Sequence, residues 1–345
     1  MKSFTKSIYN KLKNGDNVFK KTRVTIDTIY HVKKSSSMWI PEKISDYIEN
    51  TKGKIYKVTS TINSRNITIY FICYDDTSKE TILLYSQYVF LVIYLLTNNN
   101  RICSDNLEIK IYLTHFTKNA PVNYTTPFGP NEVNTGFSTA GCNTNSSITI
   151  YRKEEWFKVL IHELMHNLNL DFATLDINYA KDKLKEILGL KINYEINETY
   201  VEIWARIILL LIVSHMKTSN LKDFDESFTK LLDKEISFSV TQATKVLKHV
   251  NNTNKYTEDT HAYAYYVFTA SLINNFPIFL RWCKKNNDKS NIFDFKRERE
   301  RVESFTDLII SRLSNESFSE KITSKYNNSN NSNNKSMRMT SINIF

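Results

Sequence analysis

Between residues 55 and 151 the chain carries short apolar runs of the kind that form β-strands. Residues 55–60 (IYKVTS) and 66–74 (NITIYFICY) are rich in β-branched and aromatic side chains. Residues 107–114 (LEIKIYLT) alternate between apolar and polar positions, which is the period of a half-buried strand. With a further short strand over 148–151 (ITIY), the pattern predicts a small sheet.

An apolar helix is predicted between these strands, over residues 79–97. Its segment 81–97 is uncharged for 17 residues, which lies at the short edge of the membrane-spanning range. Because Ser86 and Gln87 interrupt the apolar run, we expect a buried core helix. A membrane anchor at 81–97 is the alternative.

From about residue 153 the apolar positions recur at helical spacing, first over 153–168. Further helices are predicted over 178–188, 195–216, 222–234, 239–250, 260–274, 276–285 and 298–313. Strands thus come first and helices second, which predicts an α+β fold. We expect a small N-terminal mixed sheet with helices, followed by a mostly helical C-terminal part.

These patterns divide the chain into four parts, with a cleft expected near residue 170. They are an N-terminal segment (1–52), an α/β part (53–170), a helical part (171–314) and a polar, low-complexity tail (315–345). For the tail we expect disorder, because so polar a composition cannot bury enough apolar surface to offset the entropy of folding.

Composition is ordinary for a soluble globular protein of 345 residues, with 41% apolar and 24% charged residues. Lys and Arg (46) exceed Asp and Glu (36), for a net charge of +10. This balance permits contact with nucleic acid or anionic lipid without requiring it. We predict no specific nucleic-acid partner and no membrane attachment; the oligomeric state is not determined by the sequence.

The four cysteines, Cys73, Cys103, Cys142 and Cys283, have no short spacing, which excludes a zinc ribbon or a CxxC motif. We expect all four to be reduced, as in intracellular proteins. The N-terminus is basic and polar and has no apolar run typical of a secretory signal. An intracellular location is therefore predicted.

Residues 162–166 read His-Glu-Leu-Met-His, an HExxH motif on a predicted helix. Histidines at i and i+4 lie one above the other on one helix face, about 5–6 Å apart at Cβ. Both His162 and His166 can then reach one Zn²⁺ at about 2.0–2.1 Å. Glu163 projects beside the metal and can act as general base toward a metal-activated water. The motif predicts one zinc ion per chain.

A catalytic zinc needs a third protein ligand, and acidic residues downstream supply candidates. Glu195, Glu198 and Glu202 fall at i, i+3 and i+7, on one face of a predicted helix. One carboxylate can bind the metal while another, four residues on, accepts the N–H of a ligand histidine. A solvated acidic helix face is the alternative.

The sequence HELMH followed by NETYVE, an HExxH…NExxxE pattern, resembles the gluzincin metallopeptidases, the thermolysin-like group. The resemblance implies a zincin-like active-site helix at the junction of the two halves. It implies His162, His166 and Glu198 as zinc ligands and Glu163 as the base. Glu202 would lie behind them and hold a ligand histidine, His162.

The chain departs from this family in one spacing, because Glu198 lies 32 residues after His166, longer than in the familiar members. An inserted helix over 178–188 would account for the difference, and the choice among Glu195, Glu198 and Glu202 stays open.

The metzincin pattern fails, since it would need Gly and His where the chain has Asn169 and Phe172. Asp171 is a candidate ligand or orienting group, although a residue at such a position more often caps the helix end.

The resemblance also implies groups that contact substrate. Gluzincin-like proteins place an edge strand before the metal helix, and here Asn134 and Gly136 would face a substrate backbone that adds to the sheet. A His or Tyr from the helical part would donate to the oxyanion, and His261 and Tyr265 are the candidates. The alternatives are an ordinary loop over 132–138 and tyrosines that pack in the core.

These observations predict a zinc-dependent metalloendopeptidase that acts on a peptide or protein substrate. The surroundings of the motif, YRKEEWFKVLIHE before it and LDF after it, also resemble metallopeptidase-like proteins of large AT-rich DNA viruses. That resemblance implies a viral protein of the host cytoplasm or the virion. The alternative is a non-catalytic, basic structural or nucleic-acid-binding protein that keeps a zinc site for stability.

Overall fold

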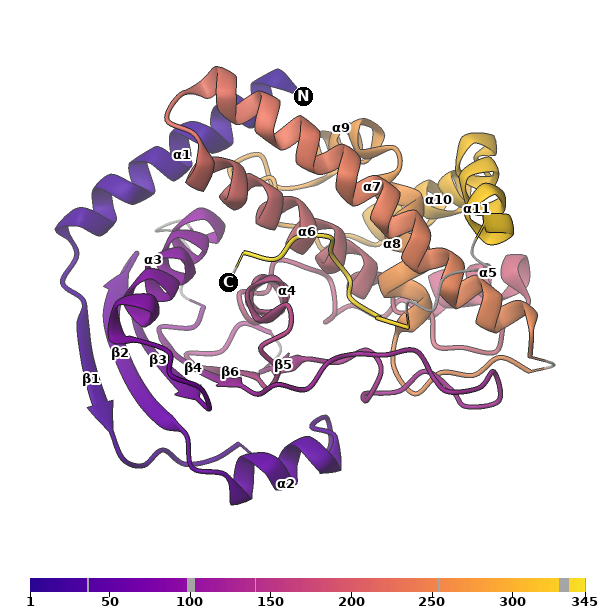
Figure 1. Cartoon of the computed structure of the whole chain (residues 1–345). Coiled ribbons are helices and arrows are strands. Elements are labelled where there is room, and N and C mark those ends of the chain that lie inside the picture. The colour runs from indigo at the N-terminus through magenta and orange to yellow at the C-terminus, as the bar shows by residue number, and fades with distance from the viewer. Residues whose placement is uncertain (36, 98–102, 140, 254, 329–334, 345) are drawn as a thin grey trace.

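Six strands of the computed structural model form one mixed sheet (Figure 1). The structure describes residues 1–35, 37–97, 103–139, 141–253, 255–328 and 335–344. The strands are β1 (Thr25–Ile29), β2 (Lys54–Ile62), β3 (Arg65–Cys73), β4 (Asn106–Leu113), β5 (Gly136–Ser138) and β6 (Asn145–Ile150). Their order is β1-β2-β3-β4-β6-β5, with β3, β4 and β6 parallel and the remaining pairs antiparallel. The short strand β5 is therefore an edge of the sheet.

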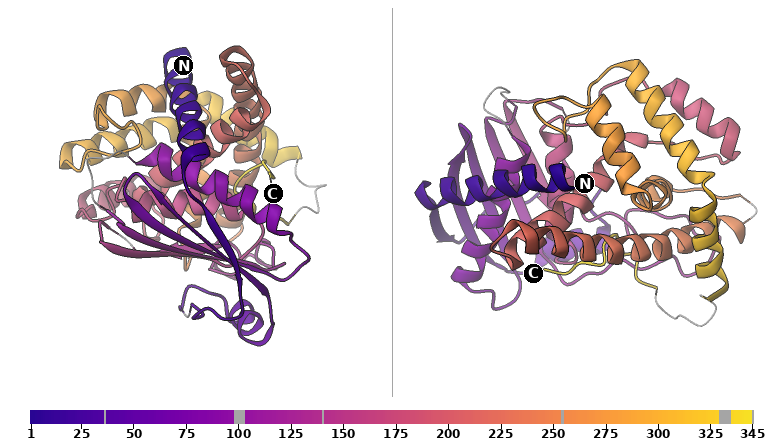
Figure 2. Two further views of the ribbon diagram at one scale, coloured as in Figure 1. Left: turned by 90° about the vertical axis from the view of Figure 1, so that its left-hand side faces the viewer. Right: turned by 90° about the horizontal axis from the view of Figure 1, so that it is seen from above.

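Helices cover both faces of this sheet. They are α1 (Lys2–Lys21), α2 (Glu42–Asn50), α3 (Lys79–Leu96) and α4 (Trp156–Asn167). Helices α3 and α4 pack on one face and α1 covers α3, whereas α2 lies alone on the other face (Figures 1 and 2). Alternating burial along β2 and β3 supplies the apolar side chains for the larger layer.

The second half of the described chain is helical and is built around one central helix, α6. Its elements are α5 (Asn178–Leu188), α6 (Ile196–Lys217), α7 (Leu221–Asn251), the π-helix η1 (Tyr263–Phe268), α8 (Thr269–Ile273), α9 (Phe276–Asn286), α10 (Arg299–Leu313) and α11 (Glu316–Asn328). Helix α6 contacts α4 on one side and α7 on the other, and one hydrophobic core runs through both halves. The predicted α+β class is confirmed.

Two helices, α3 and α6, are long and apolar enough to cross a membrane by length and composition. Within the protein, 56% of the apolar window in α3 and 89% of that in α6 are buried. Helix α3 contacts α1, α4 and the sheet. This packing is what a core helix requires, and it is more complete in α6 than in α3.

Two features of the elements differ from the sequence pattern. The predicted helices over 222–234 and 239–250 are one continuous helix, α7, because no glycine or proline separates them and Glu235 is buried as part of the helix. Residues 1–52, to which the pattern assigns no element, form α1, β1 and α2. The signal in α1 is the apolar spacing of Phe4, Ile8 and Leu12, all of them buried.

The expectation of a disordered tail over 315–345 is wrong for the residues that the structure describes. Helix α11 packs on α7, and residues 335–344 follow an extended path between α4, α6 and α7 (Figure 1). Met337 and Met339 are buried there, so the tail has apolar anchors despite its polar composition. The low-complexity run 329–334 lies outside the described residues.

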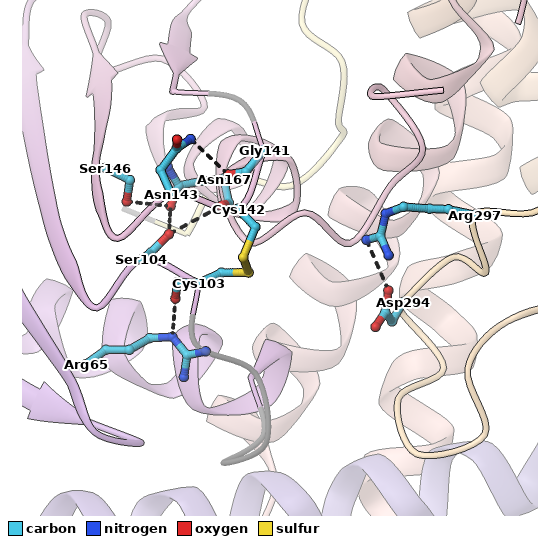
Figure 3. The surroundings of a disulfide bond; sticks show 10 residues. All are labelled: Arg65, Cys103, Ser104, Gly141, Cys142, Asn143, Ser146, Asn167, Asp294 and Arg297. Atoms are coloured by element: carbon cyan, nitrogen blue, oxygen red, sulfur yellow. Dashed lines mark hydrogen bonds and ion pairs between the residues drawn. A yellow bond between two sulfur atoms is a disulfide. The ribbon is translucent and has the colours of Figure 1, made fainter. Parts of the chain in front are cut away.

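The expectation that all four cysteines are reduced is also wrong, because Cys103 and Cys142 form a disulfide (Figure 3). Each cysteine stands three residues before a strand position, and those two positions, Asn106 and Asn145, pair in the parallel register of β4 and β6. The sheet therefore brings together two thiols that are 39 residues apart. Such bonds are typical of oxidising compartments. The cysteines therefore no longer support an intracellular location, which stays a prediction.

Candidate metal centre

The HExxH residues lie on α4, and every residue of this helix is buried. Leu160, Ile161 and Leu164 belong to the hydrophobic core and fix the helix between the sheet and α6. Asn167, at its end, accepts hydrogen bonds from Ser104 and Ser146 at 2.7 and 3.1 Å, beside the disulfide (Figure 3). The N-terminal ends of the parallel strands β4 and β6 thus anchor the C-terminal end of the helix that carries the histidines.

Three side chains from α4 and α6 converge on one point. The Nε2 atoms of His162 and His166 lie 3.2 Å apart, and Oε2 of Glu198 lies 3.1 and 3.3 Å from them. The ligand atoms of this group all lie within 4.8 Å of one another, so the group could hold a metal ion. We call His162, His166 and Glu198 the metal-centre cluster.

A carboxylate binds the outer nitrogen of each histidine. Nδ1 of His162 lies 3.1 Å from Oε2 of Glu202, and Nδ1 of His166 lies 2.6 Å from Oδ2 of Asp171. An Nδ1–H that donates to a carboxylate leaves the Nε2 lone pair free for a metal and makes it more basic. The two carboxylates therefore orient both rings with Nε2 toward the cluster and favour the tautomer with the proton on Nδ1, which metal binding needs.

A buried set of charges lies behind the cluster; we call Lys158, Glu202, Arg206 and Glu235 the rear ion network. Lys158 donates to Glu202 Oε2 at 2.8 Å and Arg206 donates to Glu202 Oε1 at 2.8 Å, while the Arg206 and Glu235 side chains are 3.9 Å apart. Burial alone would raise the pKa of Glu202, but Lys158 and Arg206 hold that pKa below its usual range. Glu202 therefore stays ionised as an acceptor for His162.

The third acidic candidate, Glu195, does not reach the cluster. Its carboxylate pairs with Lys181 and accepts a hydrogen bond from Asn193 at 2.8 Å. The structure thus separates the three acidic residues by role: Glu198 lies in the cluster, Glu202 behind it and Glu195 outside it. Helix α5, over the predicted range 178–188, occupies the extra length between His166 and Glu198.

Attraction between the histidines and the carboxylates determines which groups of the metal-centre cluster are ionised. Burial opposes ionisation of both His166 and Glu198. Attraction to Glu198 and Asp171 nevertheless raises the pKa of His166 well above its usual value, and attraction to His166 and His162 holds the pKa of Glu198 well below its usual value. Among the described residues, no Lys or Arg forms an ion pair with Glu198. Within the described part of the chain, the positive charge that can balance this carboxylate at close range is a proton on His162 or His166, and a bound cation could replace it.

Glu163 faces a cleft rather than the core. The cleft has a volume of about 210 Å³ and is lined by His162, Glu163, His166 and Glu198 together with residues from β5 and η1. Ser138, at the end of β5, donates a hydrogen bond to Glu163 Oε2 at 2.8 Å. The carboxylate is therefore held at the cleft beside the histidines, where it can exchange a proton with a molecule bound there.

Both oxyanion candidates line the same cleft. The Tyr265 hydroxyl donates to Glu198 Oε2 at 3.0 Å, whereas Nδ1 of His261 is buried and has no hydrogen-bond partner among the described residues. Burial first, and then Glu198 and Glu163, raise the pKa of Tyr265 well above its usual value, so its hydroxyl stays protonated as a donor. Tyr265 comes closest to the cluster.

The two residues expected to face substrate, Asn134 and Gly136, line the cleft from the edge of the sheet. Thr260 donates to the Asn134 side chain at 2.8 Å, which joins this edge to the start of η1. A Cβ at Gly136 would lie 2.6 Å from Ile150 and 2.9 Å from a backbone oxygen of β6. Glycine is therefore required here for the close approach of β5 to β6.

Sequence reasoning missed one polar contact of the site, that of Ser138, and left the role of Asp171 open. Ser138 belongs to no recognised motif. Its position two residues after Gly136 on an edge strand nevertheless places both residues on the same face of the sheet. Asp171 was weighed as ligand, orienting group or cap; the structure makes it the partner of His166, because the chain turns back immediately after α4.

Compared with known proteins, the chain matches no family model, no curated protein and no solved structure. We therefore infer the function from the geometry of the metal-centre cluster and its cleft.

Proposed function

We propose that this protein is a zinc-dependent metallopeptidase that hydrolyses peptide bonds internally. One observation carries the proposal: two imidazoles and one carboxylate converge at a cleft, with a second carboxylate, Glu163, beside them. Neutral imidazole nitrogens and one carboxylate oxygen are the donor set of catalytic zinc sites. The resemblance to gluzincins in the HExxH…NExxxE pattern supports the same conclusion.

The residues fit a zinc ion with an open coordination position. His162, His166 and Glu198 would hold it through Nε2, Nε2 and Oε2, since the outer nitrogens are already bound to Glu202 and Asp171. When bound, zinc supplies Lewis acidity, which polarises the scissile carbonyl and lowers the pKa of water. No Lys or Arg of the described residues pairs with Glu198, so a metal would balance the charge of this carboxylate.

The chain's own groups can then carry the proton transfers. Glu163 accepts a proton as a water oxygen attacks the carbonyl carbon, and later passes that proton to the amine nitrogen as the C–N bond breaks. Tyr265 donates its hydroxyl hydrogen bond to the oxygen on which negative charge develops. The edge strand β5 can align the substrate backbone through strand addition.

A purely structural zinc site is the less favoured alternative. Structural sites are usually closed by four protein ligands and need no general base. Here the described cluster has three ligands, opens on a cleft and has Glu163 beside it. These features favour catalysis over a stabilising role.

The test is a peptide-library digest by the zinc-loaded parent, Glu163→Gln, and Glu186→Gln, an exposed control on α5. We expect cleavage to fall by about 10³-fold in Glu163→Gln and to stay unchanged in the control. Zinc content should be the same in all three proteins. Equal cleavage by the parent and Glu163→Gln would remove Glu163 as base, and no cleavage by the zinc-loaded parent would contradict the peptidase assignment.

A further inference from the structure

A second cavity, which shares no lining residue with the cleft of the metal centre, is lined by basic residues. It has a volume of about 320 Å³ and lies between the loop 120–128, helix α7, helix α11 and the start of the C-terminal segment. Four lysines line it: Lys245 and Lys248 from α7, Lys325 from α11 and Lys335. No Asp or Glu is among the described residues that line this cavity.

The charge around this cavity is segregated along the chain. Three stretches, 109–131, 236–257 and 321–345, contain no acidic residue and carry two, three and four Lys or Arg residues respectively. Each stretch supplies part of the cavity wall. Of these nine basic residues, Lys245, Lys248, Lys325 and Lys335 line the cavity itself. The cavity wall thus carries four lysines and is built from stretches that contain no carboxylate to offset them.

The lysines of the cavity differ in their contacts and in their exposure to solvent. Lys245 is half-buried and donates to the backbone oxygen of Ser336 at 2.6 Å. Burial lowers the pKa of Lys245 to about 8, so its ammonium has lost solvation that a bound anion would restore. Lys248 lies over the ring of Tyr326 at 4.7 Å, and Lys335 is exposed.

An aromatic wall completes the cavity. The rings of Tyr124 and His249 are 5.4 Å apart in an edge-to-face arrangement, and both residues line the hollow. Burial lowers the pKa of His249, which keeps this imidazole neutral. The wall therefore offers a flat, uncharged surface next to the ammonium groups.

We propose that this cavity binds an oligophosphate, an anion with two or more linked phosphate groups, either free or as part of a nucleotide. Lysine ammonium groups bind phosphate as point charges, and ammoniums on separate walls suit linked phosphates better than one compact anion. The cavity is at the small end of the range for small-molecule sites, about 300–1,000 Å³, which favours a small ligand over a nucleic-acid duplex. This inference does not depend on the proposed peptidase activity.

The probe is inorganic tripolyphosphate, titrated into the full-length protein by calorimetry at low ionic strength, with ATP and adenosine in parallel. We expect one tripolyphosphate per chain with a dissociation constant below about 1 mM. Tighter binding of ATP than of tripolyphosphate would identify a nucleotide as the source, and equal binding would identify the phosphate chain alone. Binding of adenosine but not of tripolyphosphate would overturn the proposal.

The variant Lys325→Gln/Lys335→Gln removes two charges from the cavity without disturbing buried contacts. Its matched control is Lys230→Gln/Lys321→Gln, which removes two exposed charges outside the cavity, on the same two-helix pair α7 and α11. We expect affinity for tripolyphosphate to fall by about tenfold or more in the first variant and to change little in the second. An equal loss in both would mean attraction by net charge alone, and no loss in either would place the ligand elsewhere, including the metal centre. Either result would overturn the proposal, as would binding of a single-stranded oligonucleotide without binding of tripolyphosphate.

Discussion

Two carboxylates one helical turn apart on α6, Glu198 and Glu202, lie in contrasting surroundings. Glu202 is fully buried in the rear ion network, where Lys158 and Arg206 neutralise it. Glu198 has two histidines and Tyr265 as its neighbours and no described Lys or Arg in ion-pair contact. The rear ion network is balanced by permanent charges, whereas the metal-centre cluster is balanced only by a proton or a cation.

This difference separates a structural role from a functional one. A buried carboxylate whose cations are built into the fold holds its neighbours in place and cannot exchange partners without a large cost in free energy. A carboxylate that is balanced only by titrating groups at a cleft can exchange a proton for a metal. The two surroundings meet at His162, which contacts Glu198 through Nε2 and Glu202 through Nδ1.

The largest expected effect is on folding. Glu202→Ala leaves Lys158 and Arg206 buried without their shared partner, and the free energy of unfolding should fall by about 3–5 kcal/mol. Glu195→Ala breaks the more exposed pair with Lys181 and should cost less than about 1 kcal/mol. Denaturant unfolding of the metal-free proteins measures both values. Equal losses of unfolding free energy would show that the rear ion network stabilises the fold no more than the exposed pair does.

Tyr265→Phe should affect catalysis rather than folding or metal content. Loss of one oxyanion donor lowers kcat by about 10²-fold, and the bound metal should be retained because Tyr265 is not in the metal-centre cluster. His261→Gln is the matched variant in the same cleft and should have the smaller effect on kcat. Single-turnover cleavage of one peptide by each protein decides between them, and the reverse order would assign the oxyanion contact to His261.

Asp171→Asn should weaken metal binding without abolishing it. The carboxylate 2.6 Å from His166 Nδ1 orients the ring and increases its basicity, and loss of such a partner lowers metal affinity by about 10–100-fold. Competition with a chelator of known affinity measures the change. An affinity equal to that of the parent would mean that Asp171 only caps the end of α4, as its position in the sequence first suggested.

The smallest effect is a pH dependence of metal affinity. A histidine must lose its proton before Nε2 can bind a metal, and because the pKa of His166 is raised, protons compete with the metal to a higher pH than at a free imidazole. Affinity should therefore rise with pH, by about tenfold per unit for each proton released. A flat profile between pH 6 and 8 would contradict the assignment of His166 as a ligand.

In the metal-free protein the raised pKa of His166 makes the stability of the fold decrease with pH, whereas metal affinity increases with pH. A raised pKa in the folded state means that His166 stabilises the fold below its unfolded pKa of about 6.5, and that this contribution is lost as pH rises through the folded pKa. Thermal unfolding at several pH values, with and without zinc, separates the two effects.

The local parts of the site could be predicted from the sequence because they depend on helical spacing alone. The i, i+4 spacing of His162 and His166 fixes their shared face on α4. Spacing also places Glu195, Glu198 and Glu202 on one helix face, but it leaves open which of the three lies in the metal-centre cluster. The strands β2, β3, β4 and β6 were likewise predicted from runs of apolar residues. Each of these predictions depends only on residues that lie close together in the sequence, within one helix or strand.

Other features depend on contacts between distant segments and could not be predicted. The pairing of Cys103 with Cys142 follows from the parallel register of β4 and β6, which no spacing along the chain reveals. The tail is held by backbone N–H groups: those of Met339 and Thr340 donate to Glu155 at 2.7 to 3.0 Å. Because every residue except proline carries a backbone N–H, these contacts leave no mark in the sequence of the tail.

The most direct test of the account is the zinc affinity of three proteins: the parent, Glu198→Ala and Glu195→Ala. Zinc per chain after dialysis, measured by mass spectrometry, gives the content, and chelator competition gives the affinity. We expect about one zinc per chain in the parent and in Glu195→Ala, and a loss of affinity of about 10²-fold or more in Glu198→Ala, which removes one of three ligands. An affinity in Glu198→Ala equal to that in Glu195→Ala would contradict the metal centre.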